Sequence, residues 1–435
     1  MEMLKGRWHW AMFAVLCLGA IPATVAGQQV DVYRLFALGE VDSVIHLLEQ
    51  ESRGDTITLP AERRLLLGLA FAKNNELSEA ARVLREVWRE QPGERSVGLA
   101  LAGVYERAGR LPQALRVLAR LAEEDSTAFP VLSRLGIVTF KLGDVASAWR
   151  IFEGLSRRFP RRADVQVWRA RCAVKTDSVG AACEAYRHAV KLDSLNTAAW
   201  LGLARILLAQ DSLKAASWAV KRGLRVSPRH PQLHRLNAEI SQGLGQFEEA
   251  VVEFLEAQAL GDHSAELFQK LGNCYYALGK FDKAKEVFLR SAALKPRNPV
   301  AAYGLGLCYK QEDSLAQAAA WFRRALELSL PDYLGELYFQ LGDCSAKLGH
   351  VRQAVSLFRK ALAHGASEGP VYYALATTYD RSYQDKQPAL RAFEKALRYG
   401  GLSPEAVRYA KERVEHLREL VHFQQGRGQK SAGGS

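Results

Sequence analysis

The chain has 435 residues, of which 48% are hydrophobic and 24% are charged, a composition that excludes collagen-like and broadly disordered chains. Its formal net charge of +12 favours an anionic partner, such as an acidic protein surface, anionic lipid or nucleic acid. The basic residues are spread along the whole chain, however, so a solvated surface is the simpler interpretation.

The first 26 residues have the organisation of a signal peptide. Lys5 and Arg7 precede an apolar run, and small residues follow Pro22. The apolar run at 11–26 is 16 residues long, shorter than the roughly 20 that a spanning helix needs. We therefore expect an exported protein, periplasmic or secreted. The alternative is an uncleaved anchor, which would give membrane association through the N-terminus.

The central part of the chain repeats with a period of 34 residues, and three kinds of position keep this spacing over eight units. The first is small: Gly68, Ala102, Gly136, Ala170, Ala204, Ala238, Gly272 and Gly306. The second is alanine: Ala80, Ala114, Ala148, Ala182, Ala216, Ala250, Ala284 and Ala318. The third is large: Leu84, Leu118, Phe152, Tyr186, Val220, Phe254, Phe288 and Phe322. These registers would not coincide by chance, and they indicate a repeat architecture.

The unit at 265–298 shows helical periodicity in two halves. Apolar residues share one face in each half, Gly279 ends the first helix, and Pro296 follows the second. Each unit is therefore a helix–turn–helix hairpin. Gly272 and Ala284 lie where its helices cross, because only small side chains let the two backbones approach closely.

The segment LGNCYYALGKFDKAKEVFLRSAALKP closely resembles the tetratricopeptide repeat, or TPR. The resemblance implies an all-α fold, an α-α superhelix (TPR solenoid) of about ten hairpins over residues 61–400. First helices would line its concave face and second helices its convex face. The ninth unit follows a two-residue insertion near Leu330, and the turn of the tenth carries one extra residue.

The array is flanked by other segments. Residues 27–60 form a degenerate N-terminal helical hairpin and a loop, and residues 404–423 read as an amphipathic helix. Because a terminal repeat would otherwise expose its apolar face, we expect this helix to cap the stack. Residues 424–435 are predicted to be a disordered tail.

The resemblance also implies a protein–protein interaction scaffold, whose peptide or protein partner lies in the concave groove. Positions 2, 5, 9, 12 and 13 of each unit would face that groove. They include Arg171, Arg205 and Arg235, which would suit an acidic peptide or a carboxylate. The alternative is that these arginines pair with local acids such as Asp164 or Glu239.

In units seven to ten the groove positions hold an asparagine and four aromatic residues: Asn273, Tyr276, Tyr303, Phe339 and Tyr373. Such a row suits an extended or apolar peptide. Packing between neighbouring first helices would explain it without a ligand. TPR proteins that clamp a chaperone's C-terminal carboxylate need several basic and asparagine residues in set places, and this chain lacks that set.

Position 13 is basic in six of the ten units: Lys73, Arg107, Lys141, Lys175, Lys347 and Arg381. These residues fall in the last turn of the first helix. A cation there stabilises the negative end of the helix dipole by ~0.3–1 kcal/mol, so no ligand is needed to explain them.

Five cysteines follow the signal segment, an odd count that does not indicate a disulfide scaffold. Four of them hold position 10, where cysteine acts as a small buried hydrophobe: Cys172, Cys274, Cys308 and Cys344. Cys172 and Cys183 lie on the two helices of one hairpin, so a disulfide between them and two free thiols both stay open.

Catalytic motifs of the HExxH, CxxC, GxxxxGK and GxSxG types do not occur, and we expect no enzyme, metal or cofactor. His230 and His234 are spaced i, i+4 but lack a third ligand. Two functions remain: an interaction scaffold of the cell envelope or periplasm, and a non-catalytic subunit of an envelope assembly, secretion or cell-wall complex. An enzyme would need a site in the loop at 51–60 or in the C-terminal helix, and both are too small. Export disfavours nucleic acid as a partner.

Overall fold

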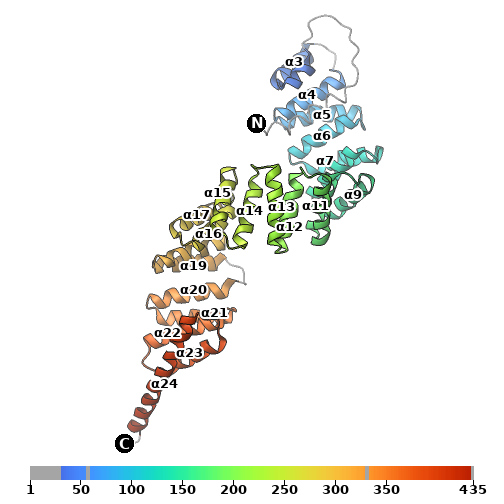
Figure 1. The fold of residues 1–435 in the computed structure, drawn as a ribbon. Coiled ribbons are helices and arrows are strands. Elements are labelled where there is room, and N and C mark those ends of the chain that lie inside the picture. The colour runs from blue at the N-terminus through green and yellow to red at the C-terminus, as the bar shows by residue number, and fades with distance from the viewer. Residues whose placement is uncertain (1–30, 55–58, 329–332, 433–435) are drawn as a thin grey trace. The chain divides into compact units, whose positions relative to one another are not determined.

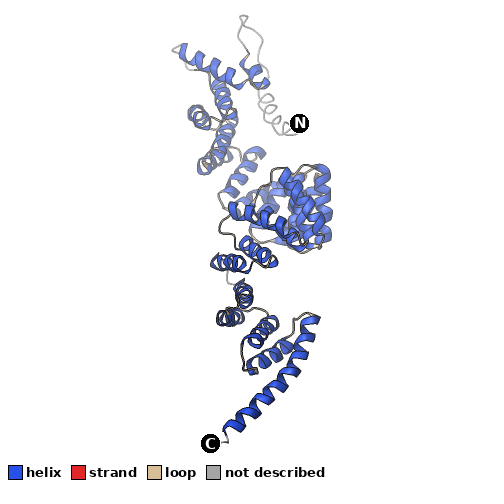
Figure 2. Cartoon of the chain, turned by 90° about the vertical axis from the view of Figure 1, so that its left-hand side faces the viewer, coloured by secondary structure: helices blue, strands red, loops and turns tan. Residues whose placement is uncertain are grey.

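The computed structural model describes residues 31–54, 59–328 and 333–432 (Figure 1). The expected signal segment at 1–26 and the insertion near Leu330 lie outside these ranges. Within them the chain forms 23 α-helices and no β-strand, joined by short loops (Figure 2). The predicted all-α fold of helical hairpins is confirmed. None of the described helices has the length and apolar character needed to cross a membrane.

Two compact units, residues 1–206 and 207–435, make up the chain and are described separately. The first contains α2 (Val32–Leu38), α3 (Val41–Gly54), α4 (Ala61–Lys73), α5 (Leu77–Glu90), α6 (Arg95–Arg107), α7 (Leu111–Glu124), α8 (Phe129–Lys141), α9 (Val145–Arg158), α10 (Ala163–Lys175) and α11 (Val179–Leu192). The boundary falls within α12 (Thr197–Ala209).

The second unit contains α13 (Leu213–Val226), α14 (Pro231–Gly243), α15 (Phe247–Ala259), α16 (Ala265–Ala277), α17 (Phe281–Leu294), α18 (Pro299–Gln311), α19 (Leu315–Leu328), α20 (Leu334–Lys347), α21 (Val351–Ala363), α22 (Glu368–Ser382), α23 (Gln387–Tyr399) and α24 (Pro404–Ala432). In both units a first helix packs on the second helix of its own hairpin, and that second helix packs on the next first helix.

The turn inside each of the first nine repeat hairpins uses one left-handed residue, which reverses the chain between the two helices. Glycine supplies it in five hairpins and asparagine or aspartate in four: Asn75, Gly109, Gly143, Asp177, Asp211, Gly245, Gly279, Asp313 and Gly349. These are the residue types that tolerate positive φ. The spacing is 34 residues up to Asp313 and 36 from there to Gly349, which agrees with the two-residue insertion.

The core is a series of large side chains set against small ones. Phe152, Phe254, Phe288, Phe322, Phe358 and Phe393 are fully buried on second helices. A Cβ atom added to Gly272 would lie 2.7 Å from Cε1 of Phe288, closer than van der Waals contact. The helices therefore cross at Gly272 as the sequence predicted, because a side chain there would collide with the buried ring.

The terminal helix α24 packs on α23. Ala410, Val414, Leu417 and Val421 on α24 join the core of the last two hairpins. Helical backbone runs to Ala432, whereas a disordered tail was predicted from residue 424. The segment has no proline to stop a helix that has already begun, and the disordered tail stays a prediction.

Candidate functional site

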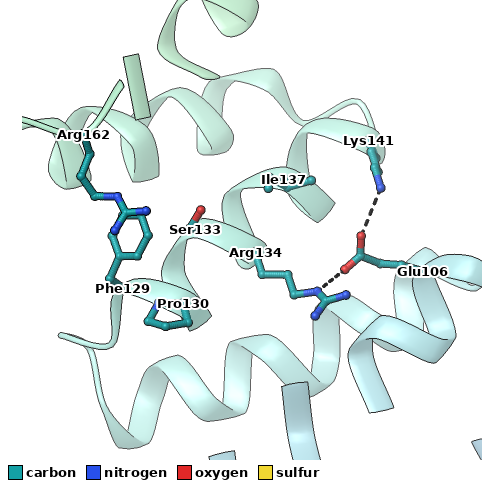
Figure 3. Close-up of a pocket in the computed structure, with 8 residues that line it drawn as sticks. All are labelled: Glu106, Phe129, Pro130, Ser133, Arg134, Ile137, Lys141 and Arg162. Atoms are coloured by element: carbon teal, nitrogen blue, oxygen red, sulfur yellow. Dashed lines mark hydrogen bonds and ion pairs between the residues drawn. The ribbon is translucent and has the colours of Figure 1, made fainter. Parts of the chain in front are cut away.

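A hollow of about 570 Å³ lies on the first-helix face of the first unit (Figure 3). Its lining comes from α6, from α8 and from the residue before α10: Glu106, Phe129, Pro130, Ser133, Arg134, Ile137, Lys141 and Arg162. Pro130, Ser133 and Ile137 occupy positions 2, 5 and 9 of the third repeat, where groove residues were expected. The hollow therefore belongs to the face that the repeat register assigns to a partner.

One carboxylate organises the charge at one end of the hollow. Glu106 on α6 is largely buried and lies between two cations of α8 (Figure 3). Arg134 Nε donates to its Oε1 at 2.6 Å, and Lys141 Nζ donates to its Oε2 at 3.1 Å. One negative charge thus faces two positive charges, and this end of the hollow keeps an excess of positive charge. Lys141, 46% exposed, is the accessible member.

The other end is aromatic and also carries a cation. The guanidinium of Arg162 lies 3.9 Å from the ring centroid of Phe129, and Figure 3 shows it over that ring. Both carboxylate oxygens of Asp164 accept from Arg162, at 3.0 and 2.9 Å. The hydrogen bond to Asp164 raises the pKa of Arg162, so the guanidinium stays charged and fixed in place. Between the two ends, Pro130 and Ile137 offer an apolar floor.

The predicted arginines Arg171 and Arg205 are brought together near one hydroxyl. Burial raises the pKa of Tyr186, and the positive charges of Arg171 and Arg205 partly offset that rise. Arg171 also lies 4.4 Å from the ring of Trp168. Among the described residues no acid forms an ion pair with Arg171, and the Asp164 alternative fails because Asp164 pairs with Arg162. Arg171 therefore retains its positive charge on α10.

Arg235 behaves differently. It lies in the second unit, where Nη1 is 3.2 Å from Asp262 Oδ2 and Nε is 3.8 Å from Glu239 Oε1. Arg235 is therefore paired with local acids, which was the alternative interpretation. Glu239 also forms an ion pair with Lys270 at 2.8 Å. Its charge is compensated within the chain.

The aromatic row of the second unit packs inwards. Rings of Tyr303, Phe339 and Tyr373 lie 5.7, 6.0 and 5.9 Å from the buried phenylalanine of their own hairpin. Tyr276 packs on Phe281 at 5.4 Å, its hydroxyl accepts from Gln311 at 3.2 Å, and Asn273 is half-buried. Their packing is mainly within a hairpin, whereas the alternative interpretation had them between first helices. Each keeps a partly exposed edge.

The position 13 cations act across the helix stack. Arg107 Nη1 donates to the carbonyl of Ala72 at 2.6 Å, and Lys73 Nζ donates to that of Phe36 at 3.2 Å. Both acceptors lie in the last turn of the preceding first helix, where carbonyls lack helical partners. The helix-end explanation therefore describes Lys73 and Arg107, which cap the preceding first helix, whereas Lys141 pairs with Glu106 and Lys347 with Asp343.

His234, Cys172 and Cys183 are the remaining sequence candidates. In the described ranges no group of three metal-binding side chains comes together. His234 is held by Glu253 at 2.7 Å and by the carbonyl of Pro228 at 2.8 Å. Cys172 and Cys183 are buried free thiols.

Glu106, Arg134 and Arg162 were not predicted from the sequence. Glu106 holds groove position 12 of the second unit, whereas the predicted groove candidates lie in units three to ten. Arg134 and Arg162 fall outside the five groove positions, and they reach the hollow because long side chains extend beyond their own register. The sequence signal for this cluster is an acid at position 12 of one unit, here Glu106, followed by a cation at position 13 of the next, here Lys141.

Comparison with known families identifies the repeats. Tetratricopeptide repeat models match residues 71–134, 134–195, 270–329 and 335–363. No curated protein matches the sequence.

Several solved structures are similar to the chain. A tetratricopeptide repeat protein from Parabacteroides merdae is 16% identical, with a TM-score of 0.47 over 57% of this chain and 98% of that one. The Cut9–Hcn1 hetero-tetramer of the APC/C is 14% identical, with a TM-score of 0.48 over 88% of this chain and 82% of that one. The human IFIT1 dimer with m7Gppp-AAAA is 17% identical, with a TM-score of 0.46 over 88% of this chain and 94% of that one.

Proposed function

Because the chain is a tetratricopeptide repeat protein, we propose that it is a non-catalytic interaction scaffold of the cell envelope or periplasm, which binds a peptide or protein segment on its first-helix face. TPR proteins generally mediate protein–protein interactions. The single observation that carries the proposal for this chain is the hollow between α6 and α8, which combines an apolar floor with an excess of positive charge at its Glu106 end.

The charge around the hollow favours an acidic partner segment. Lys141 is accessible at one end, and Arg171 on α10 has no acidic partner among the described residues. Arginine's planar fork suits a carboxylate, and the cations are already held in place, so little side-chain entropy is lost on binding. An extended segment with an apolar side chain over Ile137 and an acidic side chain at Lys141 would satisfy both features.

Placement in the envelope rests on the signal-like segment at 1–26. It is tested by the intact mass of the protein recovered from cells, which should lack about 26 residues. The alternative function, a non-catalytic subunit of an envelope assembly, secretion or cell-wall complex, uses the same surface with the partner as a permanent neighbour.

Crosslinking in cells tests the proposed surface. A photo-crosslinking amino acid replaces Ile137 in the hollow, or Arg205 on α12, in the full chain. The control replaces Gly154, an exposed residue on the second helix α9. The proposal expects one specific partner from positions 137 and 205 and none from 154. The same yield from all three positions, or no adduct from position 137, would contradict it.

A further inference from the structure

Second helices of two neighbouring hairpins expose large apolar side chains at a position that is charged in most other hairpins. Trp218 on α13 is 52% exposed and Val252 on α15 is 65% exposed. They are 34 residues apart and follow the buried alanines Ala216 and Ala250 by two residues, so they hold the same register position. In six of the other hairpins that position is charged: Arg82, Arg116, Arg150, Glu184, Glu286 and Arg391. In the eighth and ninth hairpins it holds Ala320 and Ser356.

Each exposed apolar residue lies between two charged residues on the same helical face, four positions away on either side. The basic stripe of α13 is Lys214, Trp218 and Arg222. The acidic stripe of α15 is Glu248, Val252 and Glu256. All four charged side chains are exposed, and at matching register positions the two stripes have opposite charge. Leu255, 43% exposed, widens the apolar surface of α15.

The two stripes do not neutralise each other within the chain. No ion pair in the described ranges joins Lys214 or Arg222 to Glu248 or Glu256. By contrast, Glu286 at the same position of α17 pairs with Arg290 at 2.7 Å. The nearest aromatic contact of Arg222 is with Trp218, at 5.7 Å from the ring centroid. The charges of both stripes are therefore available to a partner.

The arrangement of the helices makes this surface complementary to itself. Helix α14 packs against both α13 and α15, so the two stripe-bearing helices flank it (Figure 1). A two-fold axis between them would place the basic stripe of one copy on the acidic stripe of another, and the same contact would form a second time. Trp218 of each copy would then meet Val252 of the other.

We propose that the α13–α15 surface is a homodimer interface, in which the basic stripe of each chain docks on the acidic stripe of its partner. A second copy is the occupant because opposite charges at equivalent positions, flanking matched apolar residues, are what an isologous contact requires. An unrelated partner would need no such reversal. The interface lies on second helices and leaves the first-helix face open.

Charge reversal on the full chain tests the proposal, with sedimentation velocity as the readout. Variant A is Lys214→Glu with Arg222→Glu, and both its stripes are acidic. Variant B is Glu248→Lys with Glu256→Lys, and both its stripes are basic. The wild type should be a dimer. Variants A and B alone should be monomers, with dimer dissociation constants raised by roughly two orders of magnitude or more, because like charges then meet twice.

An equimolar mixture of variants A and B should form a heterodimer, because every like-charge contact becomes an opposite-charge contact. The matched control for variant A is Arg116→Glu with Arg150→Glu, which makes the same net charge change as variant A at exposed positions of other second helices. This control should remain a dimer. All substitutions are at exposed sites, and helical circular dichroism verifies folding. A monomeric wild type, dimeric variants A and B, or a mixture that stays monomeric would each overturn the proposal.

Discussion

Arg413 on the terminal helix holds Asp380 of the last hairpin through two hydrogen bonds. Nε donates to Oδ2 at 2.6 Å and Nη2 donates to Oδ1 at 3.0 Å. Asp380 is nearly buried, and Lys386 Nζ lies 3.6 Å from its Oδ1. The terminal helix is thus fixed to the stack by a bidentate charge pair as well as by its apolar face. This pair gives the cap a defined register.

Arg413→Met should loosen the terminal helix. The substitution leaves the Asp380 carboxylate nearly buried with only Lys386 nearby, and losing a hydrogen bond to a charged group costs roughly 1.5–3 kcal/mol. Hydrogen exchange of α24 should speed up accordingly. Arg418→Met is the matched control, because Arg418 pairs with Glu394 in solvent, and such exposed pairs contribute about 0–1 kcal/mol. Equal acceleration in both variants would contradict the role assigned to Asp380.

Acid should release the same helix. Burial raises the pKa of Asp380, but hydrogen bonds and charges from Arg413 and Lys386 lower it more, so the net shift is below the usual 3.8. Between the depressed pKa of the folded state and the usual 3.8, the unfolded state binds more protons than the folded state. The free energy of unfolding therefore rises with pH over that range. The contribution is complete above about pH 5 and is lost as pH falls through the depressed pKa. Protection of α24 should fall more steeply from pH 5 to 3 in the wild type than in Asp380→Asn, and parallel profiles would refute the linkage.

Gly272→Ala should destabilise α16 and α17 as a pair. The new Cβ atom would meet the fully buried Phe288 ring at 2.7 Å, and overpacking of this kind costs about 1–3 kcal/mol. Gly154→Ala is the control, because a Cβ atom there has no neighbour within 4 Å and gains helix propensity of about 0.5–1 kcal/mol. Urea unfolding of the two variants should shift in opposite directions. A neutral Gly272→Ala would show that the helices do not cross at this glycine.

The buried thiols should resist alkylation in the native chain. Burial raises the pKa of Cys172 to about 11 and that of Cys274 to about 12. At pH 8 the thiolate fraction is therefore very small, and the thiolate is the form that reacts. Peptide mapping after iodoacetamide treatment should find both unmodified until urea unfolds the protein. Rapid native labelling, or a peptide that links Cys172 to Cys183, would contradict the free-thiol state.

Regular features of the repeat could be predicted from the sequence, because they depend on local spacing. The close approach at Gly272 and the left-handed turns recur every 34 residues, so each position has eight or more parallel examples. The site depends on long side chains that cross between repeats. Arg235 matched the groove register, yet its partner Asp262 comes from the turn before the next hairpin.

The hollow was missed for the same reason. It is created by Glu106, which attracts Arg134 and Lys141 from the next unit, and no single repeat contains that relationship. The extent of α24 depends on the helix that has already formed, because the polar residues at its end include no proline to stop it.

The most direct measurement is the affinity of the segment that crosslinks from position 137, for three forms of the full chain. Lys141→Glu should raise the dissociation constant at least tenfold, a loss of about 1.4 kcal/mol. Arg116→Glu, with the same charge change on the exposed face of α7, should leave it nearly unchanged. Equal weakening by both variants would mean that net charge alone drives binding, and no weakening by Lys141→Glu would mean that the hollow is not the partner site.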